Sequence, residues 1–200
     1  MLRLQMKVIR RIFPLLLVIC IALSSVSIVN AFTLNSRKIY TPKAFSYHMN
    51  FGSTTVSQFS AALSQWNSAA NRNIMSLSGS THANTDYPKL DDVNRIYRLN
   101  VGNTYLGECQ PWSLSTNYMF KALYEADINI NVYHDFANSA QANKYDVATV
   151  FIHEAGHAAG LDHTSTINQV MYPYGGTNFQ LITLGSDDRG GMTYKYITNN

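Results

Sequence analysis

The segment HEAGHAAGLDH at residues 153–163 concentrates three histidines and one glutamate. His153 and His157 are four residues apart, and on a helix this spacing places both imidazoles on one face, where one ion can meet both. His163, six residues after His157, can return to the same ion. Three neutral imidazoles suit zinc and leave a fourth position for water. Glu154 stands beside the first histidine, where its carboxylate can reach that water without binding the ion.

Two less specific explanations compete with a metal site. Histidines four residues apart can be ordinary surface residues of a helix, and HExxH alone also arises by chance. The longer pattern includes two histidines, a glutamate, Gly160 and a third histidine at once, so it favours metal binding. Three protein ligands leave one position open, which indicates a catalytic site, whereas a structural zinc site is closed by four.

The pattern HExxHxxGxxH followed by a methionine turn resembles the metzincin metalloproteases. Here VMYP places Met171 eight residues after His163. The MYP turn and the segment LGSDD before a C-terminal helix are similar to the matrixin family. EADININ before the zinc helix resembles bacterial matrixin-like proteins in particular. The motif-level similarity covers residues 94–196.

The resemblance implies a role for each matching residue. Zinc would be held by the three histidines of the motif: His153, His157 and His163. Glu154 would act as general base toward a zinc-activated water and then protonate the leaving amine. Met171 would pack beneath the site without binding the metal. The resemblance therefore implies a zinc-dependent endopeptidase, a hydrolase acting on peptide bonds.

Further residues would contact the substrate. A peptide would lie extended along an edge strand, and Leu106 and Gly107 of TYLGEC are candidates for that strand. Pro173 and Tyr174 would line the specificity pocket after the methionine turn. Animal matrixins usually carry a tyrosine two residues after this proline, where Gly175 stands, so the pocket wall departs from the family pattern.

Additional metal sites have little support. Matrixins usually bind a second zinc and a calcium in a loop before the zinc helix, but that stretch is short here and His134 and Asp135 do not match it. Calcium stays a candidate cofactor at the acidic residues of a polar loop, although a solvated loop is the commoner explanation. These acids are Asp86, Asp91 and Asp92.

Apolar periodicity predicts the elements that position these residues. Apolar residues at three- and four-residue steps predict a helix over 55–70, with Thr55 and Gln58 at capping-box spacing. The zinc helix should begin after Asp146 as N-cap and end at Gly160. Alternating patterns predict strands, and polar or patternless stretches predict an irregular arm and a loop. The strands are expected at 44–51, 94–101, 104–112 and 124–133, the arm at 32–43, the long loop at 78–92 and a shorter loop at 134–145.

The C-terminal segment holds two adjacent acids. Ser186 or Asp187 is expected to cap a last helix. By resemblance, Asp187 and Asp188 would tie that helix to the methionine turn, although plain helix capping explains them nearly as well.

The resemblance implies an α+β metzincin fold, a twisted, mainly parallel sheet packed by helix 55–70 and the zinc helix. A small C-terminal part would hold His163, the methionine turn and the last helix.

The first 31 residues have the composition of an export signal. Four basic residues and no acid precede an apolar stretch, and Val29 and Ala31 are the small residues that a signal peptidase reads. We therefore expect a signal peptide at 1–31 and one catalytic domain at 32–200, with a membrane anchor through residues 12–29 as the alternative. No PRCGxPD-like segment occurs, so latency through a cysteine-switch propeptide is not expected.

Removal of such a signal changes the charge balance. The chain has 15 basic and 12 acidic residues, and without the four basic residues of the signal it has 11 against 12, a net charge of −1. This balance gives no support for nucleic-acid binding. Cys109 would be the one remaining cysteine, most simply a buried inert thiol. The expected partner is a protein or peptide substrate, and the expected form is a monomer without stable membrane association.

Overall fold

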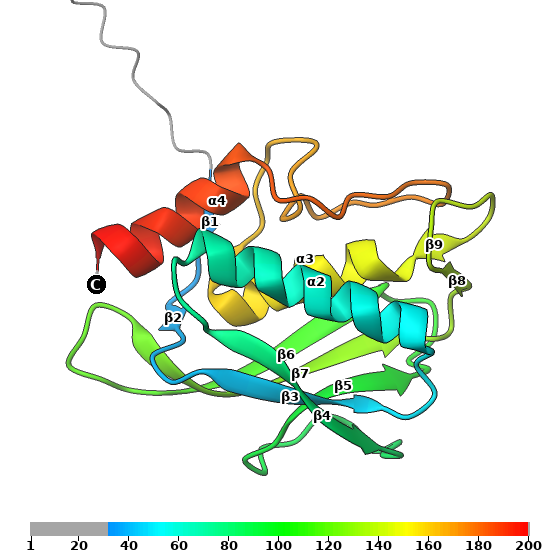
Figure 1. Cartoon of the computed structure of the whole chain (residues 1–200), viewed down its shortest axis with the longest axis horizontal. Helices are drawn as coiled ribbons and strands as arrows, with labels where there is room; N and C mark the ends of the chain where they lie inside the picture. Colours follow the sequence, from blue (N-terminus) through cyan, green and yellow to red (C-terminus); the bar gives the residue numbers. More distant parts are fainter. Residues whose placement is uncertain (1–31, 200) are drawn as a thin grey trace, which may run out of the picture. The chain divides into compact units, whose positions relative to one another are not determined.

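A six-stranded sheet forms the base of the domain in the computed structural model, which describes residues 32–199. The strand order is β2-β7-β5-β3-β4, with β6 paired along β7 (Figure 1). Only the β6–β7 pairing is antiparallel, so the sheet is mainly parallel as predicted. The strands are β2 (Arg37–Lys38), β3 (Lys43–His48), β4 (Met75–His82), β5 (Asn94–Leu99), β6 (Gly107–Leu114) and β7 (Lys121–Asn131). The expected signal peptide lies outside the described residues.

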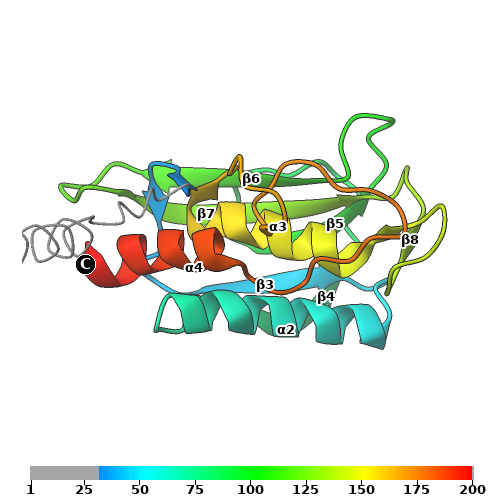
Figure 2. The ribbon, with the colours of Figure 1, turned by 90° about the horizontal axis from the view of Figure 1, so that it is seen from above.

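Two helices cover one face of this sheet. From above, α2 (Ser53–Ala69) lies over β3 and β4, and α3 (Val147–Ala159) lies over β6 and β7 (Figure 2). The helices pack through buried aromatic rings, since Phe59 stacks on Phe151 with centroids 4.0 Å apart. The Trp66 indole donates to the carbonyl of Ile152 at 2.9 Å, so its only polar atom is satisfied in the core. The α+β architecture predicted from the sequence is confirmed.

The α3 helix has the ends that its sequence predicts. The Asp146 carboxylate accepts from the Thr149 amide at 2.7 Å, which satisfies one of the first free N–H groups. Gly160 ends the helix with φ of 100°, a left-handed conformation that a side chain would strain. The chain continues into β10 (Leu161–Asp162) and then into His163.

The last helix differs from its prediction at the N-cap. Helix α4 (Ser186–Thr193) has Gly185 at that position, not Ser186 or Asp187, and continues into the π-helix η1 (Tyr194–Thr198). The Asp188 carboxylate reaches back to accept from the Gly185 amide at 2.8 Å, so the cap comes from inside the helix. Within residues 32–199, no helix is long and apolar enough to span a membrane.

Several local predictions are wrong. The predicted loop at 78–92 begins within β4, whose last five residues are small or polar, mostly exposed, and so lack an apolar alternation. The capping box of Thr55 and Gln58 is absent, because both side chains bind Asn138 instead and the helix begins at Ser53.

Two segments predicted as irregular contain short strands. The arm at 32–43 contains β1 (Thr33–Leu34), which pairs with β10, and β2, which pairs with β7. The loop at 134–145 contains β8 (Phe136–Ala137), which pairs with β9 (Tyr145–Asp146). Strands of two residues carry no detectable period, so the sequence pattern could not reveal them.

Candidate metal and catalytic site

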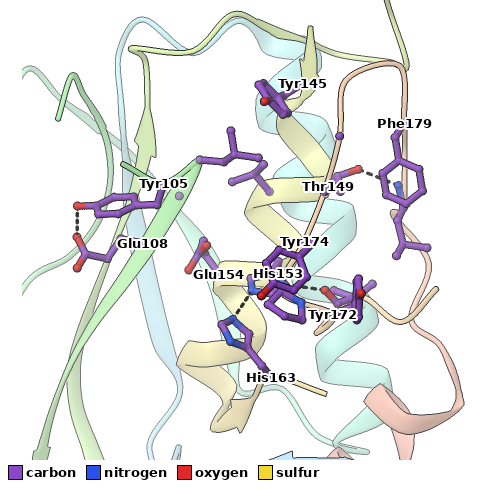
Figure 3. A pocket seen from close by; sticks show the side chains of 18 of the residues that line it. Tyr105, Glu108, Tyr145, Thr149, His153, Glu154, His163, Tyr172, Tyr174 and Phe179 are labelled. Atoms are coloured by element: carbon purple, nitrogen blue, oxygen red, sulfur yellow. Dashed lines mark hydrogen bonds between the residues drawn. The ribbon is translucent and has the colours of Figure 1, made fainter. Parts of the chain in front are cut away.

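The three histidines of the motif converge at one point beside the cleft. The Nε2 atom of His163 lies 3.2 Å from Nε2 of both His153 and His157. Figure 3 shows the imidazoles of His163 and His153 beside each other. Four nitrogens placed tetrahedrally at zinc-ligand distance would be about 3.3 Å apart. Both distances to His163 are therefore close to what a tetrahedral zinc ion requires, and the ligand atoms of the three histidines all lie within 4.8 Å of one another.

Backbone carbonyls determine which ring nitrogens are free to bind metal. Nδ1 of His153 lies 2.7 Å from the Val170 carbonyl, and Nδ1 of His157 lies 3.0 Å from the Leu161 carbonyl. A carbonyl can only accept, so each Nδ1 carries the hydrogen and each Nε2 keeps its lone pair. Burial lowers the pKa of His153 to about 3 and also lowers that of His157. Both imidazoles are thus held neutral, the form that binds metal.

Glu154 is buried between α3 and the edge strand β6. Gly107 makes this close approach possible, because a Cβ there would lie 3.0 Å from Glu154 Cγ and 2.6 Å from Val150 Cγ1. Burial raises the pKa of Glu154 to about 8, and the nearby Glu108 carboxylate adds to the shift. A divalent cation beside the carboxylate would oppose this effect and favour the ionised form.

The methionine turn packs directly against the helix that carries the first two histidines. Met171 is 2% exposed, and a Cβ at Gly156 would lie 2.3 Å from its sulfur. Asp188 anchors the turn by accepting from the amides of Val170 at 2.8 Å and Met171 at 3.1 Å. Of the two roles open for Asp188, capping and tying the helix to the turn, the structure therefore shows both. Asp187 contacts the Thr164 hydroxyl at 3.3 Å.

A cleft of about 930 Å³ runs past the histidines and Glu154. Gly107, the first residue of β6, and the preceding Leu106 line one side, and Pro173 and Tyr174 line the other, so all four residues expected to contact substrate border it. Several further lining residues were not predicted from the sequence. These are His134, Tyr145, Thr149, Val150, Tyr172, Phe179 and Leu181.

Only some of the missed residues carried a sequence signal. Thr149 and Val150 lie four and three residues before His153, on the same helix face, and this spacing could have identified them. Phe179 and Leu181 belong to the segment after the methionine turn, where no period exists. Cys109 lines the cleft from β6, and burial raises its thiol pKa well above the ordinary value, which fits the expected inert thiol.

Two of the acids considered for calcium bind other side chains. Asp91 forms an ion pair with Arg95 at 2.7 Å, and Asp92 accepts from the Tyr124 hydroxyl. Among residues 32–199, the histidine triad is the only group of three or more side chains placed to hold one metal ion. Calcium therefore gains no support from this loop.

Comparisons with known proteins find a metalloprotease family and two metalloendoproteinases. The sequence model of the family described as Matrixin matches residues 40–197. Metalloendoproteinase 1 of Glycine max is 32% identical over 65 residues, 32% of this chain and 21% of that protein. Metalloendoproteinase 2-MMP of Arabidopsis thaliana is 39% identical over 54 residues, 27% of this chain and 14% of that protein. The matched segments thus span about a fifth or less of each relative's length.

Proposed function

Because the chain belongs to the matrixin family, we propose that it is a zinc-dependent endopeptidase acting on protein or peptide substrates. One observation carries the proposal: three imidazoles converge, with His163 Nε2 3.2 Å from Nε2 of each of the other two, beside a buried carboxylate on the wall of an open cleft. Three ligands leave a coordination position for water, which a purely structural zinc site would not.

In this proposal the chain's own groups move the protons. Zinc held by His153, His157 and His163 would supply a Lewis acid and a water of lowered pKa. Glu154 takes the proton of the attacking water, and its buried carboxyl holds that proton until the leaving nitrogen accepts it. Its position next to His153 keeps the carboxylate beside the metal position, while Gly107 leaves room for its side chain.

We propose that the substrate binds as an additional strand along β6. Among residues 32–199 this strand pairs with β7 alone, so its other edge has backbone N–H and C=O groups available for an extended peptide. Leu106 and Gly107 lie at the end of this edge that borders the cleft. Pro173 and Tyr174 would contact the side chain that follows the cleaved bond.

Export remains part of the proposal. The basic start, the apolar stretch and Val29 with Ala31 favour cleavage before Phe32 and secretion of a monomeric domain. A membrane anchor through residues 12–29 is the alternative. N-terminal sequencing of the native protein separates the two, since Phe32 as first residue supports secretion and an intact Met1 supports the anchor.

Digestion of a peptide library tests the activity and the cleavage preference together. We expect cleavage by the zinc-loaded protein, its loss with a chelator and its return when zinc is added back. Protein that binds about one zinc per chain but cleaves no peptide would refute the proposal. It would favour a zinc-stabilised extracellular binding domain instead.

A further inference from the structure

The N-terminal arm packs against the segment between the metal ligands His157 and His163, although it contributes no ligand itself. Strand β1 (Thr33–Leu34) pairs antiparallel with β10 (Leu161–Asp162), which immediately precedes His163. The next arm residue, Asn35, donates its backbone N–H to the Gly160 carbonyl at 3.0 Å. The arm therefore braces the segment that joins the second histidine to the third.

The side chain of Asn35 reaches the outer layer of the site, which is formed by the groups that hydrogen-bond to the metal ligands. Its Nδ2 donates to the carbonyls of Leu161 at 3.1 Å and His157 at 3.2 Å. Its Oδ1 accepts from the Arg37 amide at 2.9 Å, which determines the orientation of the side-chain amide. The Leu161 carbonyl is the same group that accepts from Nδ1 of His157. One carbonyl thus links the Asn35 amide to a metal-binding imidazole.

Lys195 of η1 fixes the arm from the other side. Its ammonium is 0% exposed and donates to the carbonyls of Asn35 at 2.9 Å and Arg37 at 2.6 Å. It also donates to the Gly160 carbonyl at the end of α3. These bonds leave Asn35 little freedom to shift relative to the end of the zinc helix.

We propose that Asn35 is a positioning residue for His157. By holding the Leu161 carbonyl in place, it keeps the Nδ1–H of His157 engaged and aims Nε2 at the metal position. Partners of this outer layer typically change metal affinity by about 10- to 100-fold when they are removed. The inference rests on the proposed function, because it requires that the triad binds zinc.

The variant Asn35→Asp tests the donor role with almost no change of shape. The carboxylate can still accept from Arg37, but it places oxygen against the two carbonyls that Nδ2 now serves. We expect zinc affinity about 10-fold weaker or more, measured by competition with a chromophoric chelator. Asn35→Ala removes the amide without adding charge, and its loss should be similar. Asn199→Asp is the matched control, because Asn199 Nδ2 donates to the Tyr194 carbonyl at the surface.

Two further measurements separate positioning from simple stability. Visible spectra of the cobalt-substituted proteins should shift in both Asn35 variants and not in the control, because they report ligand geometry. Thermal unfolding of the metal-free proteins measures the structural cost alone. Wild-type zinc affinity and spectrum in folded Asn35→Ala or Asn35→Asp would overturn the inference and leave the peptidase proposal standing. A wild-type protein that takes up no zinc would overturn both.

Discussion

Replacement of Asp188 by asparagine removes the anchor of the methionine turn with minimal change of shape. The buried carboxylate accepts three backbone N–H groups, from Val170 at 2.8 Å, Gly185 at 2.8 Å and Met171 at 3.1 Å. One oxygen serves Val170 and Gly185, and the other serves Met171. Whichever way an asparagine turns, its NH₂ group therefore faces at least one of these donors.

The expected cost follows from this count. A hydrogen bond to a charged group contributes about 1.5–3 kcal/mol, and a buried donor left without a partner adds to the loss. We expect Asp188→Asn to lower the free energy of unfolding by about 3 kcal/mol. For a domain of this size, that corresponds to a fall in Tm of about 6–12 °C. Zinc affinity should also fall, because the Val170 carbonyl holds Nδ1 of His153 at 2.7 Å.

Thermal unfolding followed by circular dichroism, in excess chelator, measures the first effect. Asp187→Asn is the matched control, since it removes the same charge from the same helix end. The Asp187 carboxylate contacts the Thr164 hydroxyl at 3.3 Å, so we expect a loss of about 0.5 kcal/mol. Equal shifts in Tm for the two variants would refute the claim that Asp188 anchors the turn.

Three further changes should have measurable effects. Gly156→Ala would place a Cβ 2.3 Å from the Met171 sulfur and 2.7 Å from Trp66 Cζ2, and both side chains are buried. Urea unfolding should therefore show a free energy of unfolding lower by about 1–3 kcal/mol. Unchanged stability would contradict this tight packing. Burial raises the pKa of Asp127 from 3.8 to about 7, so the native state holds a proton that the unfolded state releases between these values. The free energy of unfolding should therefore fall as pH rises through that window, by on the order of 2 kcal/mol relative to Asp127→Asn; parallel pH curves would contradict this. Zinc at about 100 times its Kd should stabilise the wild-type chain by about 2.7 kcal/mol, and calorimetry that finds the same Tm with and without chelator would count against a zinc site.

Two of the three histidines and the glutamate could be predicted to lie together because they share one helix. His153, Glu154 and His157 need only the helical period to be brought together, and the helix ends follow from Asp146 and Gly160. The methionine turn required a motif, not a period. The sequence predicts local structure where that structure depends on contacts between near neighbours.

Contacts between distant segments could not be predicted from the sequence. Asn35 and His157 are separated by 122 residues, and no local pattern connects them. The arm that carries Asn35 forms strands of two residues, too short to show alternation. The three N–H groups that Asp188 accepts belong to segments brought together only by folding, so the sequence left anchoring and capping as alternatives.

The variant Glu154→Gln tests whether Glu154 moves the proton in a zinc peptidase. Glutamine has nearly the same shape but cannot accept the proton, so the variant should bind zinc normally. Its measured zinc content is therefore the control for an intact metal site. We predict that the variant keeps about one zinc per chain and cleaves a peptide substrate about 10²- to 10⁴-fold more slowly than wild type. A zinc-loaded variant that cleaves at the wild-type rate would contradict the account.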